Sequence, residues 1–407
     1  MFVFAAIASA ALGAASQAPE SRLRQQPSFA SITSPAPAGS AQPNLATDAS
    51  GRVWLSWLDT DAAGKRRFRI AALKGTEWSA PITVMEGDAL LANWADFPSV
   101  FVTRGGTLAA HLLERGPSRG GYGIRMRTSS DQGRTWSAPV APHTDQTTAE
   151  HGFVSFFEAP GANGLGLVWL DGRDAAAHGS TGHAGGMALR SSILGNSASA
   201  ESVVDARVCD CCQTSAATTS DGVIVAYRDR SEAEVRDISV VRLVNGRWSA
   251  PATVHADGWT INGCPVNGPA IAASGRNVAI AWFTMPDGKP HTRVAFSSNA
   301  GQSFGKPIEI TGDVTLGRLG ITMFGPDRAL VSSIERKSTG AALVVRKVFA
   351  DGYVGSAVAV ADVTSERASG FPRIVMSGTD AVIAWTEIAA RTPPQVRVAR
   401  GSIGANR

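Results

Sequence analysis

The stretch Ser129-Ser130-Asp131-Gln132-Gly133-Arg134-Thr135-Trp136 decides the fold, because its Ser, Asp, Gly and Trp have the spacing of a tight turn between two strands. In such a turn the Asp carboxylate can accept backbone hydrogen bonds, Gly permits a positive φ, and Trp packs between sheets. A degenerate second copy is Ser297-Ser298-Asn299-Ala300-Gly301-Gln302-Ser303-Phe304. The two copies indicate that the chain repeats a strand-rich unit.

The repeated unit has a regular length. Near-identical Trp-Ser-Ala-Pro segments begin at Trp78, Trp136 and Trp248, and Phe304 begins a degenerate fourth. A second marker is a bulky, mostly aromatic residue that closes a β-like run, at intervals of 56, 56, 58, 55, 52 and 51 residues; its members are Trp57, Leu113, Trp169, Tyr227, Trp282, Ile334 and Trp385. Four short strands in each interval are typical of the blades of a β-propeller.

We therefore expect an all-β chain folded as a β-propeller of four-stranded blades, with seven blades predicted and six as the alternative. The seventh unit is incomplete, because the chain ends soon after Trp385. The segment Pro27–Ile32 resembles the missing strand. Pairing this N-terminal strand with the last blade would close the ring and bury both edges. One propeller domain over residues 19–407 follows from this pattern.

The turn sequence S-x-D-x-G-x-T-W at Ser129–Trp136 resembles the Asp-box of the sialidase-like (BNR/Asp-box repeat) β-propeller superfamily. The resemblance implies a propeller fold over nearly the whole chain. For activity it implies three arginines that hold a sugar carboxylate, an Asp acid/base and a Tyr–Glu nucleophile pair. Asp96 or Asp171 would be the acid, and Tyr122 is the candidate nucleophile. The family's F/Y-R-I-P motif is present only with its letters in another order, in Phe371–Ile374.

The bulk composition is that of a soluble globular protein, with 44% hydrophobic and 18% charged residues among 407. The net charge is only +4 and no run of five Lys or Arg occurs, so nucleic acid is not an expected partner. Residues 1–18 have a short apolar run followed by small residues, which predicts a signal peptide and is too short for a membrane span. We expect a periplasmic or extracellular monomer.

Unusual polar residues gather on one predicted face of the ring. In a meander blade, the turns between third and fourth strands lie at one end, and the inter-blade loops lie at the other end. The inter-blade loops and the ends of the second strands carry most of the candidates: Asp96, Arg115, His151, Asp171, Arg173, Arg228, Asp229, Arg230, Arg318 and Arg367. This convergence predicts a functional site opposite the Asp-box turns.

Three of the four cysteines, Cys209, Cys211 and Cys212, occupy one inter-blade loop, and Cys264 occupies the next. Export and the even count favour two disulfides, with Cys211 or Cys212 paired to Cys264. Alternatively, the thiolates bind a soft metal such as Cu(I), or Zn²⁺, together with His151. A reactive thiol or redox site is the third interpretation.

The first functional hypothesis is a metal site, with copper the expected ion, for metal handling or redox chemistry. Its ligands would be Cys209, Cys211, Cys212, Cys264 and His151. The residues that would carry the chemistry are Asp171, Arg173, Arg228, Asp229 and Arg230, and those that would bind substrate are Asp96, Arg115, Arg318 and Arg367. The alternative is an exo-α-sialidase-like glycoside hydrolase acting on acidic sugars, with the cysteines as disulfides and no cofactor. A binding propeller without catalysis is the third class. The partner would be a small molecule, a sugar or a metal donor.

Overall fold

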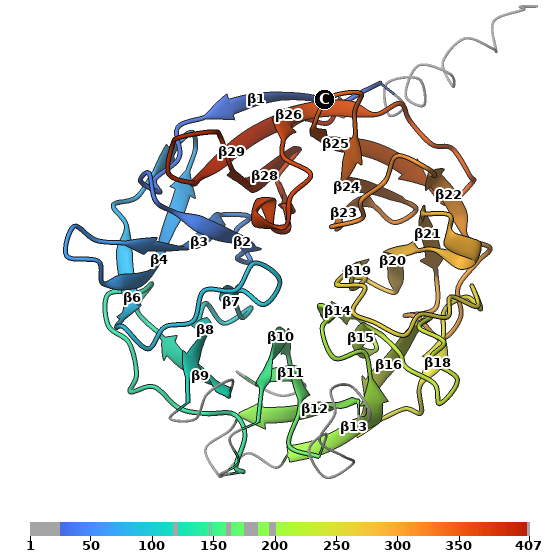
Figure 1. The fold of residues 1–407 in the computed structure, drawn as a ribbon, viewed down its shortest axis with the longest axis horizontal. Helices are drawn as coiled ribbons and strands as arrows, with labels where there is room; N and C mark the ends of the chain where they lie inside the picture. The colour runs from blue at the N-terminus through green and yellow to red at the C-terminus, as the bar shows by residue number, and fades with distance from the viewer. Residues whose placement is uncertain are drawn as a thin grey trace, which may run out of the picture.

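The computed structural model describes residues 25–404 except 117–120, 146, 148, 160–163, 175–185 and 195–200. These residues form seven antiparallel sheets arranged as a ring around a central axis, so the protein is a seven-bladed β-propeller (Figure 1). The predicted all-β fold and the blade number are confirmed, and the six-bladed alternative is excluded. The predicted signal peptide lies outside the described residues.

The first three complete sheets follow one another along the chain. Blade 1 contains β2 (Ala41–Thr47), β3 (Val53–Thr60), β4 (Arg66–Lys74), β5 (Glu77–Trp78) and β6 (Ile82–Glu86). Blade 2 contains β7 (Ser99–Val102), β8 (Leu108–Arg115) and β9 (Tyr122–Ser129). Blade 3 contains β10 (His151–Glu158), β11 (Leu165–Asp171), β12 (Met187–Leu194) and β13 (Glu201–Val208).

The next three sheets repeat this order. Blade 4 contains β14 (Ser215–Thr219), β15 (Gly222–Arg228), β16 (Ile238–Val244), β17 (Arg247–Trp248) and β18 (Ala252–Thr253). Blade 5 contains β19 (Ala270–Ser274), β20 (Asn277–Thr284), β21 (His291–Ser297) and β22 (Ile308–Thr311). Blade 6 contains β23 (Gly320–Gly325), β24 (Arg328–Arg336), β25 (Ala341–Phe349) and β26 (Val358–Val363).

The seventh blade joins the two ends of the described chain. It contains β27 (Arg373–Ser377), β28 (Asp380–Glu387) and β29 (Gln395–Ser402), and β1 (Ser28–Ile32) is its outermost strand. The pairing of β1 with β29 is antiparallel and runs from Ser28 opposite Ser402 to Ile32 opposite Val398. The predicted closure of the ring by the N-terminal strand is therefore confirmed.

The repeat marker is the residue that packs the blades together. In each blade it lies on the second strand, and every member is at most 3% exposed: Trp57, Leu113, Trp169, Tyr227, Trp282, Ile334 and Trp385. Trp169 belongs to a cluster shared by blades 2 and 3, and Trp282 to one shared by blades 4 and 5. Because each interface is apolar and continuous, the ring is a stiff frame for its loops.

Helical structure among the described residues is confined to two short 3-10 segments, η2 (Pro286–Gly288) and η3 (Arg367–Ser369). None of the described helices is long and apolar enough to cross a membrane.

The turn that decides the fold follows β9 and is held by its own side chains. Asp131 accepts hydrogen bonds from the Thr135 amide at 2.9 Å and the Thr135 hydroxyl at 2.7 Å. The Ser129 hydroxyl accepts the Gly133 amide at 2.9 Å, and the Trp136 indole donates to the Gly133 carbonyl at 3.1 Å. The hydrogen bonds that Asp131 accepts, first from the Thr135 amide and then from the hydroxyls of Thr135 and Ser129, lower its pKa to about 2. The carboxylate therefore has a structural role.

The degenerate copy after β21 uses the same hydrogen bonds. The Ser297 hydroxyl accepts the Gly301 amide at 3.0 Å, and the Asn299 side chain accepts the Ser303 amide at 3.1 Å. An amide oxygen thus replaces the carboxylate oxygen of the first copy. Both turns follow the third strands of their blades, so the inter-blade loops lie at the opposite end of the ring.

Candidate functional site

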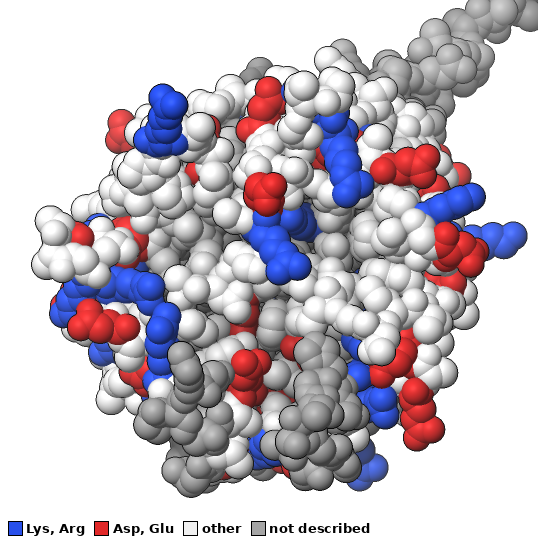
Figure 2. Space-filling model, in the orientation of Figure 1, with Lys and Arg blue, Asp and Glu red and all other residues white. Residues whose placement is uncertain are grey.

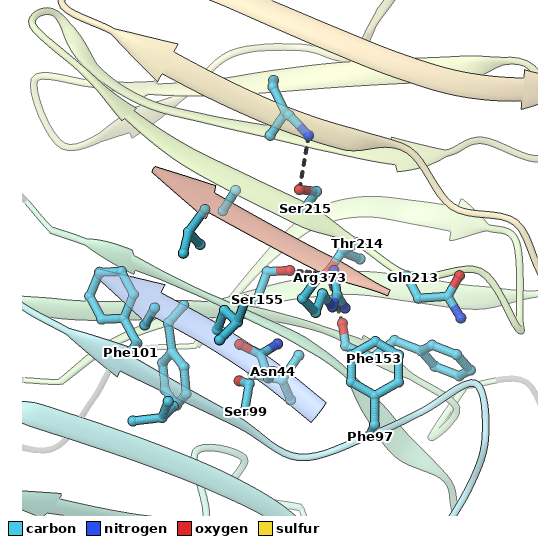
Figure 3. A pocket seen from close by; sticks show the side chains of 18 of the residues that line it. Asn44, Phe97, Ser99, Phe101, Phe153, Ser155, Gln213, Thr214, Ser215 and Arg373 are labelled. Carbon is cyan, nitrogen blue, oxygen red and sulfur yellow. Dashed lines mark hydrogen bonds between the residues drawn. The ribbon is translucent and has the colours of Figure 1, made fainter. Parts of the chain in front are cut away.

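The inner strands enclose a central cavity of about 490 Å³ (Figure 3). Its wall comes from blades 1, 2, 3, 4, 5 and 7 and is largely polar, with Asn44, Asp96, Ser99, Ser155, Gln213, Thr214, Ser215 and Arg373 among its lining residues. The Thr214 hydroxyl donates to the Phe153 carbonyl at 2.7 Å and lies 2.8 Å from the Ser155 hydroxyl. Small hydroxyl side chains line the cavity because each blade supplies only its innermost strand there.

Phe97 in the cavity wall leads to two further aromatic rings, and these contact two arginines outside the cavity lining. Trp94 stacks on Phe371 with centroids 5.9 Å apart, and Phe371 contacts Phe97 at 5.8 Å. The guanidinium carbon atoms of Arg318 and Arg367 lie 5.6 and 5.7 Å from the Trp94 ring centroid. Arg318 donates to the carbonyls of residues 365 and 366, so it also fixes η3.

Arg373 is the third arginine of this group and begins β27. Its guanidinium carbon lies 4.4 Å from the Phe97 ring centroid. Its Nε is buried without a hydrogen-bond partner, and burial lowers the pKa of Arg373 to about 10. Within the described residues, no carboxylate pairs with Arg318, Arg367 or Arg373. Basic side chains are visible near the centre of the ring in Figure 2. Burial lowers the pKa of Arg318 and the nearby charge of Glu366 opposes that shift, so the positive charge of this group is partly compensated.

A buried acid lies in the wall of the same cavity. Asp96 accepts a hydrogen bond from the Tyr122 hydroxyl at 3.1 Å and from the Phe153 amide at 2.8 Å. Gly152 allows this approach, because a Cβ there would lie 1.8 Å from an Asp96 oxygen. Burial raises the pKa of Asp96 to about 7, against the two hydrogen bonds, and the charge of Glu150 adds to the rise. Burial also raises the pKa of Tyr122.

Replacing Asp96 by asparagine is expected to alter how stability depends on pH. The folded pKa of Asp96 is above its unfolded value, so folding becomes less favourable as the pH rises from about 4 to about 7 and the buried carboxyl ionises. Asp96→Asn should remove that loss, amounting to a few kcal/mol at most. Urea unfolding at pH 5 and pH 8 measures it, with the partly exposed Asp221→Asn as control. If the free energy of unfolding changed between pH 5 and pH 8 by the same amount in Asp96→Asn and in the wild type, the raised pKa assigned to Asp96 would be wrong.

A second group of ionisable side chains surrounds the start of β10 and the end of β11. His151 Nε2 lies 3.1 Å from Asp145 Oδ1 and 3.5 Å from Asp171 Oδ2. His143 Nδ1 is 3.0 Å from the same Asp145 oxygen, and the two imidazole rings stack with centroids 4.0 Å apart. Arg173 binds Asp171 at 2.7 Å and Asp145 at 3.1 Å. These ion pairs hold the pKa of Asp171 below its usual range against burial.

This group opens to a lateral cavity of about 370 Å³, whose lining includes Arg115, Tyr122, His143, Asp145 and His151. Arg115 is exposed there and is remote from the arginines around Trp94. Tyr122 lines this cavity, while its hydroxyl partner Asp96 lines the central cavity. The hydrogen bond between them therefore crosses the wall that separates the two cavities.

Arg228 is a structural side chain in this fold. It is 1% exposed, and its guanidinium donates to the carbonyls of Asn267, Arg236 and Phe283 at 2.5 to 3.0 Å. It also lies 4.8 Å from the Trp259 ring centroid. Since Asn267 and Phe283 belong to the blade 4–5 connection and blade 5, Arg228 ties the fourth blade to the fifth.

Arg230 and Asp229 are likewise saturated by neighbours. Arg230 pairs with Asp210 at 2.9 Å and with Glu234 at 2.9 Å, and it is 3% exposed. Asp229 accepts the Arg230 amide at 2.7 Å and the Ser239 hydroxyl at 3.0 Å. Both side chains therefore brace the loop after β15.

The four cysteines form two disulfides, Cys209–Cys212 within one loop and Cys211–Cys264 between two loops. The second bond joins the entry of blade 4 to the entry of blade 5. This is the disulfide alternative of the sequence prediction, and a disulfide sulfur is no thiolate ligand. The expected association of His151 with the cysteines is wrong, because its ring nitrogens face Asp145, Asp171 and the Ala149 carbonyl.

The structure thus divides the predicted site residues into separate groups. Asp96 lines the central cavity, and Arg318 and Arg367 lie over the Trp94 ring beside it. Asp171, Arg173 and His151 lie together around the start of β10 and the end of β11. Sequence reasoning gave no role to three further groups, Arg373, Glu150 and the pair His143 and Asp145. The sequence feature that could have identified Arg373 is its position at the start of an inner strand, within the reordered motif Phe371–Ile374.

No protein-family model and no curated protein sequence matches the chain. Among solved structures it is similar to a protein of unknown function from Dyadobacter fermentans DSM 18053, with 12% identity, a TM-score of 0.53, and coverage of 92% of this chain and 97% of that one. The phage phi92 endosialidase has 10% identity and a TM-score of 0.49 over 94% and 70% of the two chains. The NanB sialidase of Streptococcus pneumoniae has 11% identity and a TM-score of 0.47 over 90% and 69%.

At these identities the similarity bears on the fold alone, and the two sialidases are too distant to carry an argument. The class that fold and site define is a seven-bladed β-propeller with a central cavity lined by Asp96 and Arg373 among others, two further arginines beside it, and two disulfides in its inter-blade loops. The propeller fold expected from the resemblance is confirmed, whereas membership of the sialidase-like superfamily stays a prediction.

Proposed function

We propose that the protein binds a small carboxylate-bearing sugar in its central cavity and acts on it as a sialidase-like glycoside hydrolase. One observation carries this proposal: Arg318, Arg367 and Arg373 gather around Trp94, Phe97 and Phe371 with no carboxylate partner in the described residues. Arg318 is bonded to backbone carbonyls and Arg367 is exposed, but Arg373 has a buried Nε without a partner, which is unfavourable unless a ligand supplies an acceptor. Arginine also binds carboxylates bidentately, which suits an acidic sugar.

The pair Asp96 and Tyr122 would supply the proton chemistry. With a pKa of about 7, Asp96 can both hold and release a proton at neutral pH. Asp96, which lines the central cavity, would protonate the glycosidic oxygen as its bond to the anomeric carbon breaks, and the departing alcohol would carry that proton away. The resulting carboxylate would then take a proton from the water that attacks the anomeric carbon. Tyr122 lines the lateral cavity and would position Asp96 through its hydroxyl hydrogen bond.

The test is binding and turnover by the purified, oxidised protein. Calorimetry with N-acetylneuraminic acid should give saturable binding, and a neutral sugar such as N-acetylglucosamine should give none. A fluorogenic sialoside should be hydrolysed by the wild type and not by Asp96→Asn. Binding without turnover would reduce the function to a non-catalytic binding propeller, and the absence of both would overturn the proposal.

The cysteines support a second candidate function, copper binding after reduction. The sulfur atoms of Cys209, Cys211 and Cys212 lie within 4.8 Å of one another, which suits a trigonal thiolate site for Cu(I). A dithiol reductant would first convert both disulfides to thiols. Zn²⁺ is the other ion that such thiolates bind.

The reduced protein, titrated anaerobically with Cu(I) against a chromophoric competitor, should bind one ion, and the oxidised protein none. Cys264→Ser retains the three clustered sulfurs and should bind Cu(I), whereas Cys211→Ser should not. Equal binding by both variants, or none by the reduced wild type, would exclude the copper function.

We also propose that the chain is exported and works as a single-domain monomer in the periplasm or outside the cell. The two disulfides support an oxidising compartment. Mass spectrometry of the mature N-terminus from a periplasmic fraction tests the predicted cleavage near residue 18.

A further inference from the structure

Outside the central cavity, the side chains best arranged for a ligand are two histidines and an aspartate at the entrance to blade 3. One nitrogen of His143, one nitrogen of His151 and a carboxylate oxygen of Asp145 all lie within 4.8 Å of one another. The Asp145 oxygen is 3.0 Å from the His143 nitrogen and 3.1 Å from the His151 nitrogen. Ligands of a metal ion bound at about 2.0–2.2 Å lie roughly 3–3.5 Å apart, so these two separations fit adjacent ligands. The two stacked imidazole rings would turn out of their parallel arrangement to direct both lone pairs at one ion.

The hydrogen bonds of His151 leave one nitrogen without a partner. Its Nδ1 contacts the Ala149 carbonyl at 3.1 Å, an acceptor, so Nδ1 carries the proton. Nε2 then presents a lone pair to the carboxylates of Asp145 and Asp171, yet it forms no hydrogen bond and its side chain is 1% exposed. A neutral imidazole nitrogen facing two carboxylates is unfavourable unless a proton or a metal ion lies between them. A backbone carbonyl on the other ring nitrogen is also the usual partner of a metal-binding histidine.

The charge around these atoms favours a cation. The carboxylates of Asp145, Asp171 and Glu201 face the guanidinium groups of Arg173 and Arg190, which leaves an excess of negative charge when both histidines are neutral. Arg173 would lose only its contact with Asp145 if an ion took that oxygen, because it keeps Asp171 at 2.7 Å and Glu201 at 2.9 Å. The ion therefore need not unpair any arginine.

We propose that His143, Asp145 and His151 bind one divalent first-row transition-metal ion, such as Zn²⁺ or Co²⁺, with the lateral cavity giving access to its remaining coordination position. Two imidazoles and a carboxylate suit these ions better than the oxygen-binding Ca²⁺. The site is separate from the cysteines and does not depend on the proposed hydrolase. Tyr122 and Arg115, which line the same cavity, would lie beside a molecule bound to the open position.

The test uses the full-length oxidised protein after chelation, in which no free thiol is available. Co²⁺ should bind one to one with visible d–d absorption of a low-coordinate site, and Zn²⁺ should displace it. His151→Gln and Asp145→Asn should each weaken binding at least about 100-fold, since even outer-shell partners contribute 10-fold to 100-fold. His291→Gln, at a similar His–carboxylate pair with Glu309 on blade 5, is the matched control and should bind as the wild type does.

Circular dichroism of each variant reports whether the ring is intact, and Asp145→Asn preserves side-chain shape where His151→Gln does not. If the wild type binds no Co²⁺ or Zn²⁺, or if His143→Gln/His151→Gln binds as tightly as the wild type, the proposal is wrong. Hydrolysis of a sialoside by a protein that fails this test would leave the proposed function intact.

Discussion

Arg373→Met is expected to weaken binding of an acidic sugar by about 10-fold to 150-fold, because a hydrogen bond to a charged group contributes about 1.5–3 kcal/mol. Arg373 lies in the wall of the central cavity, and its guanidinium has no carboxylate partner in the described residues. Its removal should leave folding intact. The free energy of unfolding should even rise slightly, since the variant no longer desolvates an unpaired charge.

Calorimetry with N-acetylneuraminic acid and urea unfolding measure the two effects of this change. Arg400→Met is the matched control, because Arg400 pairs with Asp380 and lines a groove between blades 1 and 7, away from the central cavity. Arg373→Lys should retain part of the affinity, since it keeps the charge and loses the planar pair of donors. Unaltered binding by Arg373→Met would remove this arginine from the proposed site.

The second large effect is expected on stability. Arg228→Met should lower the free energy of unfolding by about 3–5 kcal/mol, because three buried carbonyl oxygens of blades 4 and 5 lose their donor. Chemical denaturation measures the change. Arg242→Met is the control: Arg242 also reaches blade 5, but with one hydrogen bond, to the Ala300 carbonyl at 2.8 Å, so about 1 kcal/mol is expected.

The same variant separates a structural from a catalytic role for Arg228. At a temperature where the folded variant predominates, sialoside turnover should stay within a few-fold of the wild type. If turnover disappeared while the free energy of unfolding was unchanged, the role assigned to Arg228 from the sequence would be right and the structural role wrong.

The fold was predictable because one kind of position repeats. A bulky residue on the second strand of every blade is buried, and most of these residues pack against a neighbouring blade, so their spacing reports the blade period directly. Trp57, Trp169 and Trp282 are all fully buried in this role. The incomplete last unit then required a partner strand, and the N-terminal segment was the remaining candidate.

The site was less predictable, because a residue type does not reveal its partners. The sequence predicted a functional role for Arg228 because charged residues surround it in the chain. Its partners are backbone carbonyls, which every residue carries, so the sequence could not identify them. The same four cysteines satisfy a disulfide or a metal hypothesis, and only the pairing Cys211–Cys264 separates them. His143 and Asp145 come from an irregular connection, whose path no repeat defines.

The pairing of β1 with β29 also sets the order in which the molecule can be completed. Ser28 is synthesised long before its partner Ser402, so the nascent chain is an open arc until β29 is available. The central cavity takes its wall from the inner strands of six blades, whereas β1 and β29 lie outside that wall and complete the seventh blade. A chain cut short before residue 395 would therefore keep the residues that line the cavity and lose the strand pairing that closes the ring.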